Sequence, residues 1–168
     1  MLIDILIVLA IFAFIVFLWL VYTRAFGAEF IETPKHVRKA ISEILKLNKK
    51  DIFYDLGSGI GSLLLEVSPK VKEAIGIEID PIRFLIAYLK IRIKRVKNVK
   101  LIFGNIFNKN LNNATKIFVF LSKEANEKLG KKLNKETKNA IVVSYKWPIK
   151  NLKLIKVDKE NGLYKHKV

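Results

Sequence analysis

The sequence predicts an α/β fold with a mainly parallel sheet, preceded by one apolar helix. Three observations lead to this prediction: an unbroken apolar run near the N-terminus, a regular alternation of strand-like and helix-like segments, and a cluster of glycines directly after the first strand. Alternation favours a parallel sheet, because each helix carries the chain back to the start of the next strand. The 168 residues are enough for one domain in addition to the apolar helix.

The apolar run covers residues 5 to 22 and is long enough to cross the hydrocarbon core of a bilayer. A signal peptide would have a shorter apolar core and a basic start, whereas this chain begins Met1-Leu2-Ile3-Asp4. All basic residues follow Tyr22, so the positive-inside rule predicts a cytoplasmic C-terminal part. We therefore expect a single-pass membrane protein, with a transmembrane anchor over residues 1–23 and one cytoplasmic domain over residues 24–168.

Helices are expected wherever apolar residues recur at helical spacing. After a linker at residues 25–32, Thr33 followed by Pro34 is typical of an N-cap and a first-turn proline. Asp80 before Pro81 suits the same arrangement, and Ser122 is also placed as an N-cap. The expected helices cover residues 34 to about 47, 62–67, 81–95 and 123–133.

Strands are expected in the short apolar runs between these helices, and a turn at Glu160-Asn161-Gly162 predicts a terminal hairpin. The sequence thus predicts a Rossmann-like sheet of seven strands, five of them parallel. The expected strands cover residues 52–55, 74–78, 99–103, 116–120, 140–144, 152–157 and 163–168.

Asp55 ends the first strand, and Gly57, Gly59 and Gly61 follow it at every second position. Glycine permits a sharp turn into the next helix and lets a ligand approach the main chain closely. An acidic residue before the glycines would repel a pyrophosphate, but it suits a ligand with a cationic amino group and ribose hydroxyls. The Lys-Ser/Thr pair of nucleoside triphosphate sites is absent here. The pattern favours S-adenosylmethionine over NAD or ATP.

Two further strand ends carry polar side chains. Glu78 ends the second strand, where its carboxylate can reach two ribose hydroxyls, and Asn105 follows the third strand. Cofactors bind at the carboxyl ends of the strands in such sheets. We therefore expect both residues to lie near the glycine loop.

These motifs resemble motifs I and II of the class I S-adenosylmethionine-dependent methyltransferases. The order of the apolar segment and three further stretches is similar to the single-span protein-lysine methyltransferases, whose mitochondrial members modify the ATP synthase c subunit and the adenine nucleotide translocase. The three stretches are residues 30–34, 120–126 and 143–148.

The resemblance implies a Rossmann-like seven-stranded methyltransferase sheet, S-adenosylmethionine as cofactor, and methyl transfer to a lysine of a membrane-associated protein. Related enzymes carry Asp at the position of Asn105, where it accepts from the adenine amino group; Asn accepts through its amide oxygen without charge assistance. They also fold the segment that contains Thr33 over the cofactor. The expected cofactor-binding residues are Thr33, Asp55, Gly57, Ser58, Gly59, Gly61, Glu78 and Asn105.

Methyl transfer depends more on the positioning of the reactants than on acid–base groups of the protein. Methyl transfer from a sulfonium is an in-line displacement, and alignment of the reactants can supply about 7 to 11 kcal/mol. The sequence does not assign a general base. Trp147 and Pro148 are candidate walls of an acceptor channel. The weak catalytic candidates are Ser122, Glu124, Ser144 and Tyr145.

The amino-acid composition and net charge limit the kinds of ligand and partner that we expect. The chain has no cysteine and only two histidines, far apart in sequence, so disulfides are excluded and no metal is expected. The net charge is +16, and residues 24–168 alone carry +17 because the first 23 residues contain only Asp4. Such a charge suits an anionic membrane leaflet or nucleic acid, and it also arises from a Lys-rich composition. The anchor restricts access to RNA, so we expect a membrane protein as substrate and disfavour nucleic acid.

Three alternatives stay open at this point. The acceptor of the methyl group is a lipid-soluble small molecule in the first and RNA in the second. In the third, the domain is a non-catalytic module that binds lipid or RNA.

Overall fold

The structure is a computed structural model that describes residues 1–26 and 31–168. It divides into two compact units, residues 1–30 and 31–168. The linker expected at residues 25–32 falls partly within a helix, and its residues 27–30 lie outside the described part of the chain. Phe30, the first residue of the 30–34 stretch, lies there too.

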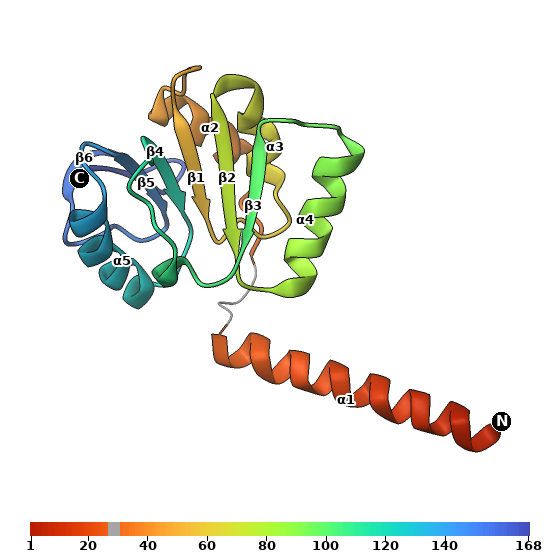
Figure 1. Cartoon of the computed structure of the whole chain (residues 1–168). Helices are drawn as coiled ribbons and strands as arrows, with labels where there is room; N and C mark the ends of the chain where they lie inside the picture. The colour runs from red at the N-terminus through yellow and green to blue at the C-terminus, as the bar shows by residue number, and fades with distance from the viewer. Residues whose placement is uncertain (27–30) are drawn as a thin grey trace. The chain divides into compact units, whose positions relative to one another are not determined.

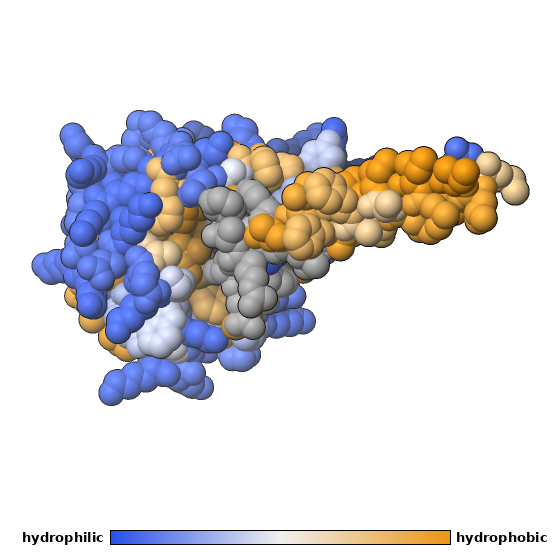
Figure 2. Space-filling view, turned by 90° about the horizontal axis from the view of Figure 1, so that it is seen from below, coloured by the Kyte–Doolittle hydropathy of each residue, from blue (hydrophilic) through white to orange (hydrophobic). Residues whose placement is uncertain are grey.

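Within its described residues, the first unit contains one helix, α1 (Leu2–Phe26). Its residues Leu2 to Trp19 have a mean hydropathy of 3.0, and none of them is buried. Figure 2 shows this helix as an almost continuous apolar surface. By length and composition α1 can cross a bilayer, and an N-terminal signal sequence has the same properties.

The second unit is built on a seven-stranded mixed sheet with the strand order β3-β2-β1-β4-β5-β7-β6 (Figure 1). The first five strands are parallel, and β7 is antiparallel to both β5 and β6. The predicted number of strands, the five parallel strands and the terminal hairpin are confirmed. The strands are β1 (Ile52–Leu56), β2 (Glu73–Glu78), β3 (Val99–Phe103), β4 (Lys116–Val119), β5 (Ile141–Tyr145), β6 (Lys153–Asp158) and β7 (Leu163–Lys167).

The helices agree with the sequence prediction apart from their ends. Asp80 caps its helix by accepting from the amides of Ile82 and Arg83, as expected. The N-cap predicted at Thr33 is wrong: Pro34 occupies that position, without a side-chain cap. The helices are α2 (Lys35–Leu45), α3 (Ser62–Val67), α4 (Pro81–Ile93) and α5 (Lys123–Glu136), with short 3₁₀ turns η1 (Ser68–Lys70) and η2 (Ile106–Asn108).

The helix ends differ because backbone conformation decides them. Helix α2 stops at Leu45, not near Leu47, because Lys46 adopts a left-handed conformation with φ of 51°. Helix α5 runs three residues beyond the expected Leu133. Its extra turn is held by Lys132, which pairs with Glu136 one turn later.

Both faces of the sheet are covered by helices. Phe53 and Phe118 face one way and pack in an apolar cluster with residues of α2 and α3. Tyr54 and Ile117 face the other way and pack in a second cluster, which includes residues of α5. Burial on both faces explains why the parallel strands read as continuous apolar runs instead of alternating ones.

Gly76 lets helix α3 and the glycine loop lie directly on the sheet. A Cβ atom at this position of β2 would stand 2.4 Å from Cδ1 of Leu64 and 2.7 Å from Oγ of Ser58. Leu64 belongs to α3 and Ser58 to the loop before it, so no side chain fits between the strand and either of them. This packing role of Gly76 was not predicted from the sequence.

We expect Gly76→Ala to lower the free energy of unfolding by about 1–3 kcal/mol, because the extra methyl overpacks the contact of β2 with Leu64 and Ser58. Denaturant unfolding of the purified chain in detergent measures this change. Lys72→Ala, in the exposed turn before the same strand, is the control and should stay within about 0.5 kcal/mol. Equal unfolding midpoints for both variants would contradict this account of the packing.

Candidate active site

The register of the parallel strands aligns one residue from each of four strands at the carboxyl edge of the sheet. Leu56 pairs with Ile77 on one side and with Val119 on the other, and Val119 pairs with Ser144. The residues that follow these four therefore lie in a row. They are Glu78, Gly57, Phe120 and Tyr145.

The loop from Gly57 to Gly61 is held by backbone hydrogen bonds to the end of β2. The amides of Gly57 and Ser58 both donate to the carbonyl of Ile77, at 2.9 and 3.1 Å. Gly57, Gly59 and Gly61 have φ of 85°, 53° and 75°, a region that other residues rarely adopt. The alternating glycines are thus required by the backbone of this turn.

Glu78 closes the loop through its side chain. Its carboxylate is 3% exposed and accepts three backbone N–H groups. Oε2 accepts from Gly59 at 2.7 Å, and Oε1 accepts from Ile79 and Asp80 at 3.0 and 2.8 Å. A carboxylate has about four acceptor positions, so capacity for one more donor remains on Oε2. This role in holding the loop was not predicted from the sequence, because it depends on a contact between residues 19 apart.

Asp55 is a second buried carboxyl group beside Glu78. It is 4% exposed, and burial together with the negative charge of Glu78 raises the pKa of Asp55 to about 8. A positive charge on a ligand would favour the ionised form. Nearby, the buried Oγ of Ser58 has no protein hydrogen-bond partner within the described residues. Two buried carboxyls, an unpaired hydroxyl and an open glycine backbone fit a ligand with a cationic group and several hydroxyls.

Asn105 lies at the same edge of the sheet, in the loop that follows β3. The amide of Gly104 donates to the carbonyl of Glu78 at 2.9 Å, which places the β3 loop beside the β2 end. The Asn105 Oδ1 accepts from the amide of Phe107 at 2.9 Å and caps η2. A ligand contact would therefore use the second lone pair of this oxygen or the side-chain NH₂ group.

The hydrogen bond observed at Thr33 does not place this residue beside the glycine loop, Glu78 or Asn105. In the part of the chain that the structure describes, its carbonyl accepts from Nη1 of Arg38 at 2.6 Å. Arg38 also donates from Nε to Glu66 of α3 at 2.7 Å. Thr33 is therefore tied to α2 and α3 and only indirectly to the glycine loop that precedes α3.

The four catalytic candidates have different environments. Ser122 caps α5 by accepting from the amide of Ala125 at 3.2 Å. Ser144 is fully buried, 3.4 Å from Nε2 of His166, and so lies out of reach of a substrate. A hydrogen bond from its own backbone amide, and then one from Ser122, lower the pKa of the exposed Glu124 carboxyl. Of the four, Tyr145 is the one in the aligned row.

Tyr145 belongs to an aromatic cluster at the ends of β4 and β5. Its ring meets that of Phe120 edge to face, with centroids 4.7 Å apart. The ammonium of Lys146 lies 5.3 Å from the Phe120 centroid and 5.8 Å from the Tyr145 centroid. This cluster therefore already accepts a lysine ammonium.

The loop after Tyr145 is fastened to α5 by a buried amide. Asn126, with no exposed surface, donates from Nδ2 to the carbonyl of Trp147 at 2.9 Å. The Trp147 side chain itself is 46% exposed, in keeping with a channel wall. This role of Asn126 was not predicted from the sequence, although a polar residue in line with Leu129 and Leu133 on the buried side of α5 is a signal for it.

Comparison with known proteins identifies the family. Residues 55–156 match the family model described as the ANTKMT methyltransferase domain. The chain belongs to this methyltransferase family. The match starts at Asp55, so it contains the glycine loop and the aligned row but not α1.

Individual relatives agree with this assignment. A protein-lysine N-methyltransferase of Saccharolobus islandicus is 34% identical over 146 residues, which cover 83% of this chain and 89% of that protein. An RNA methyltransferase from Salinibacter ruber, solved in complex with S-adenosyl-L-homocysteine, has a TM-score of 0.75 at 25% identity and covers 82% of this chain and 92% of its own. A putative methyltransferase from Escherichia coli shares the fold, with a TM-score of 0.68 at 15% identity. The protein is an S-adenosylmethionine-dependent methyltransferase with a Rossmann-like fold.

We predict opposite effects of Asp55→Asn on cofactor binding and on stability. The raised pKa, from 3.8 to about 8, means that the folded chain holds this proton more tightly than the unfolded chain does. Ionisation therefore opposes folding as pH rises between these values. The variant should unfold at a higher temperature than the parent at pH 7, and this gain should vanish below about pH 4. Its affinity for S-adenosylmethionine should fall at least about tenfold, because a charge-assisted contact is lost.

Thermal unfolding and calorimetric titration measure the two quantities, and Asp158→Asn is the matched control. Hydrogen bonds from Asn161 lower the pKa of Asp158, so its ionised form stabilises the fold at neutral pH. Asp158→Asn should leave cofactor affinity unchanged and lose stability near neutral pH. Unchanged cofactor affinity in Asp55→Asn would remove Asp55 from the site, and loss of stability at pH 7 would contradict its raised pKa. Asp55→Ala should abolish cofactor binding without unfolding the domain.

Proposed function

We propose that this enzyme transfers a methyl group from S-adenosylmethionine to a lysine side chain of a protein at or in a membrane. The observation that carries the proposal is the 34% identity, over most of both chains, to a protein-lysine N-methyltransferase. The apolar helix α1 supports the membrane part, because a tethered enzyme meets substrates in the same membrane at high local concentration. The positive-inside pattern supports a cytoplasmic domain.

In this proposal the carboxyl edge of the sheet holds the cofactor. Asp55 faces its amino group, Glu78 takes a ribose hydroxyl on the free position of Oε2, and Asn105 contacts the adenine. The backbone and Ser58 hydroxyl of the glycine loop lie against the remaining polar atoms. Thr33 contributes by positioning the chain before α2. When bound, the cofactor supplies a methyl group already activated on a sulfonium.

The aromatic cluster of Phe120 and Tyr145 is the proposed acceptor site. Both rings already lie within cation–π distance of the Lys146 ammonium, and a substrate lysine can take that place. The rings would hold the substrate lysine as an ammonium, and removing water from it lowers its pKa and favours the neutral amine, which is the nucleophile. The ammonium would first release one proton to water. The neutral nitrogen would then form its bond to the methyl carbon as the carbon–sulfur bond breaks, giving a methylated ammonium and a neutral thioether. No side chain of this edge is assigned as a general base.

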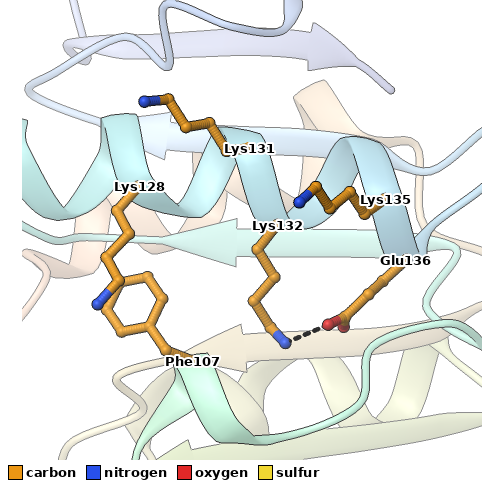
Figure 3. Close-up of a pocket in the computed structure, with 6 residues that line it drawn as sticks. All are labelled: Phe107, Lys128, Lys131, Lys132, Lys135 and Glu136. Atoms are coloured by element: carbon orange, nitrogen blue, oxygen red, sulfur yellow. Dashed lines mark hydrogen bonds and ion pairs between the residues drawn. The ribbon is translucent and has the colours of Figure 1, made fainter.

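A second candidate acceptor is RNA. The Salinibacter ruber neighbour is an RNA methyltransferase, and helix α5 carries a basic surface beside an open hollow of about 270 Å³. In Figure 3, Lys128, Lys132 and Glu136 extend toward the segment of Phe107, and the Lys128 ammonium lies 4.4 Å from that ring. Lys132 pairs with Glu136, which reduces the charge available to a phosphate. The lysine proposal is favoured because its supporting relative is more similar in sequence.

Methyl transfer from labelled S-adenosylmethionine to native membranes tests the proposal. We expect the label in protein, on lysine nitrogen, identified by mass spectrometry after proteolysis. The Asp55→Ala variant, in which cofactor binding should be lost, is the control for cofactor-dependent transfer and should give no label. Label found in the lipid extract, or in RNA added to the reaction, and not in protein would overturn the lysine assignment.

We predict that Tyr145→Ala lowers kcat/KM for the protein acceptor by at least about tenfold, because the wall that Tyr145 forms with Phe120 is lost. Cofactor affinity should stay within about twofold of the parent, since the ring is placed on the acceptor side. Tyr145→Phe keeps the ring and should retain most activity. If Tyr145→Phe is as impaired as Tyr145→Ala, the hydroxyl is catalytic and the proposed role of the ring is wrong.

A further inference from the structure

Helix α4 carries two apolar stripes on opposite sides, and only one of them is buried. Ala87 and Ile91 face the interior, next to Gly61 at the start of α3. The other stripe is exposed, with 39% to 79% of each side chain accessible. Its members are Ile82, Leu85, Ile86, Leu89 and Ile93.

The spacing of the exposed residues places them on one face. At about 100° per residue, the five side chains fall within an arc of about 100°, centred opposite Ala87 and Ile91. Five large apolar side chains on one exposed helix face form an uncommon surface for a soluble protein, in which exposed apolar residues are usually scattered. This face, called the α4 stripe below, therefore needs a partner.

Basic residues border the α4 stripe on both sides. Lys90 lies on one flank and Arg92 on the other, and Lys94 and Arg95 follow the helix. The guanidinium of Arg92 is 5.4 Å from the ring of Tyr88, and its Nε donates to the Tyr88 hydroxyl at 3.0 Å. The sequence from Pro81 to Lys97 contains no acidic residue.

We propose that the α4 stripe binds the surface of an anionic bilayer, with the helix axis in the membrane plane. An apolar face bordered by Lys and Arg, with an aromatic residue at the border, is the pattern of interfacial helices. A second copy of this chain fits less well, because stripe-to-stripe contact would bring the basic flanks of two helices together without an acidic residue between them. The inference rests on the membrane anchoring that is part of the proposed function.

Such binding would orient the active site. Helix α4 begins at Pro81, three residues after Glu78, so its first turn lies at the carboxyl edge of the sheet (Figure 1). With the α4 stripe on the bilayer, this edge is held close to the membrane plane. The preferred acceptor is then a lysine at the membrane surface, not one in a domain far from it.

Single spin labels on the full chain test this proposal, since the chain has no cysteine of its own. We would place labels at Ile86→Cys in the α4 stripe, at Ile155→Cys on β6 as the exposed control, and at Phe12→Cys in α1. The chain is reconstituted in nanodiscs of phosphatidylcholine with or without phosphatidylglycerol. Accessibility to oxygen and to a water-soluble nickel complex reports whether each label lies in the bilayer.

We expect the Ile86 label to be accessible to oxygen and protected from nickel in anionic nanodiscs, while the Ile155 label stays in water. Replacing Lys90 and Arg92 by Gln should lower the equilibrium constant for bilayer contact about fivefold per residue. An Ile86 label in water while the Phe12 label lies in the bilayer overturns the inference and leaves the proposed function intact. If the Phe12 label is also in water, the anchoring itself fails. Dipolar broadening between Ile86 labels would show that a second copy covers the stripe, and would also overturn the inference.

Discussion

The carboxylate of Glu78 makes the contacts on which the geometry of the candidate active site depends. It accepts three backbone amides, one of them from Gly59 across 19 residues of sequence. This bond ties the glycine loop to the end of β2, and the parallel register then brings Phe120 and Tyr145 into line with the same loop. A charged acceptor is well suited to this work, because hydrogen bonds to an ionised group are about twice as strong as neutral ones.

The arrangement has an energetic cost that the ligand can offset. Two buried carboxyl groups lie close together, and the pKa of Asp55 is raised to about 8 as a result. When no ligand is bound, ionisation of Asp55 opposes folding. With a cationic ligand beside it, the ionised carboxylate makes a favourable contact. Sites that bind charged ligands often hold such groups in environments that shift their pKa. The Ser58 hydroxyl, buried without a protein partner among the described residues, is another polar group that a ligand would satisfy.

Much of the fold could be predicted from the sequence, because strands buried on both faces appear as short apolar runs between polar helix ends. The number of strands, the five parallel strands and the terminal hairpin follow from alternation and turn residues, and all seven strands lie within about two residues of their predicted positions. The spatial order of the strands was not predicted from the sequence. The prediction of an N-cap at Thr33 was wrong. The position of an N-cap depends on backbone angles, and the pair Thr33-Pro34 does not determine these angles by itself. The structural roles of Gly76, Asn126 and the Glu78 side chain were missed, since each depends on a contact with a distant part of the chain.

The sequence by itself determined the chemical character of the protein: an apolar segment long enough to cross a bilayer, a glycine loop behind an acidic strand end, and a strongly basic domain. These features are local, because a few adjacent side chains or the spacing of glycines suffice to define them. Only the tertiary structure decided which candidates are available to a substrate, because burial is a property of the packed chain. In the folded chain Ser144 is buried, Ser122 caps α5, and Tyr145 lies beside Phe120. One apolar side of α4 is exposed to solvent.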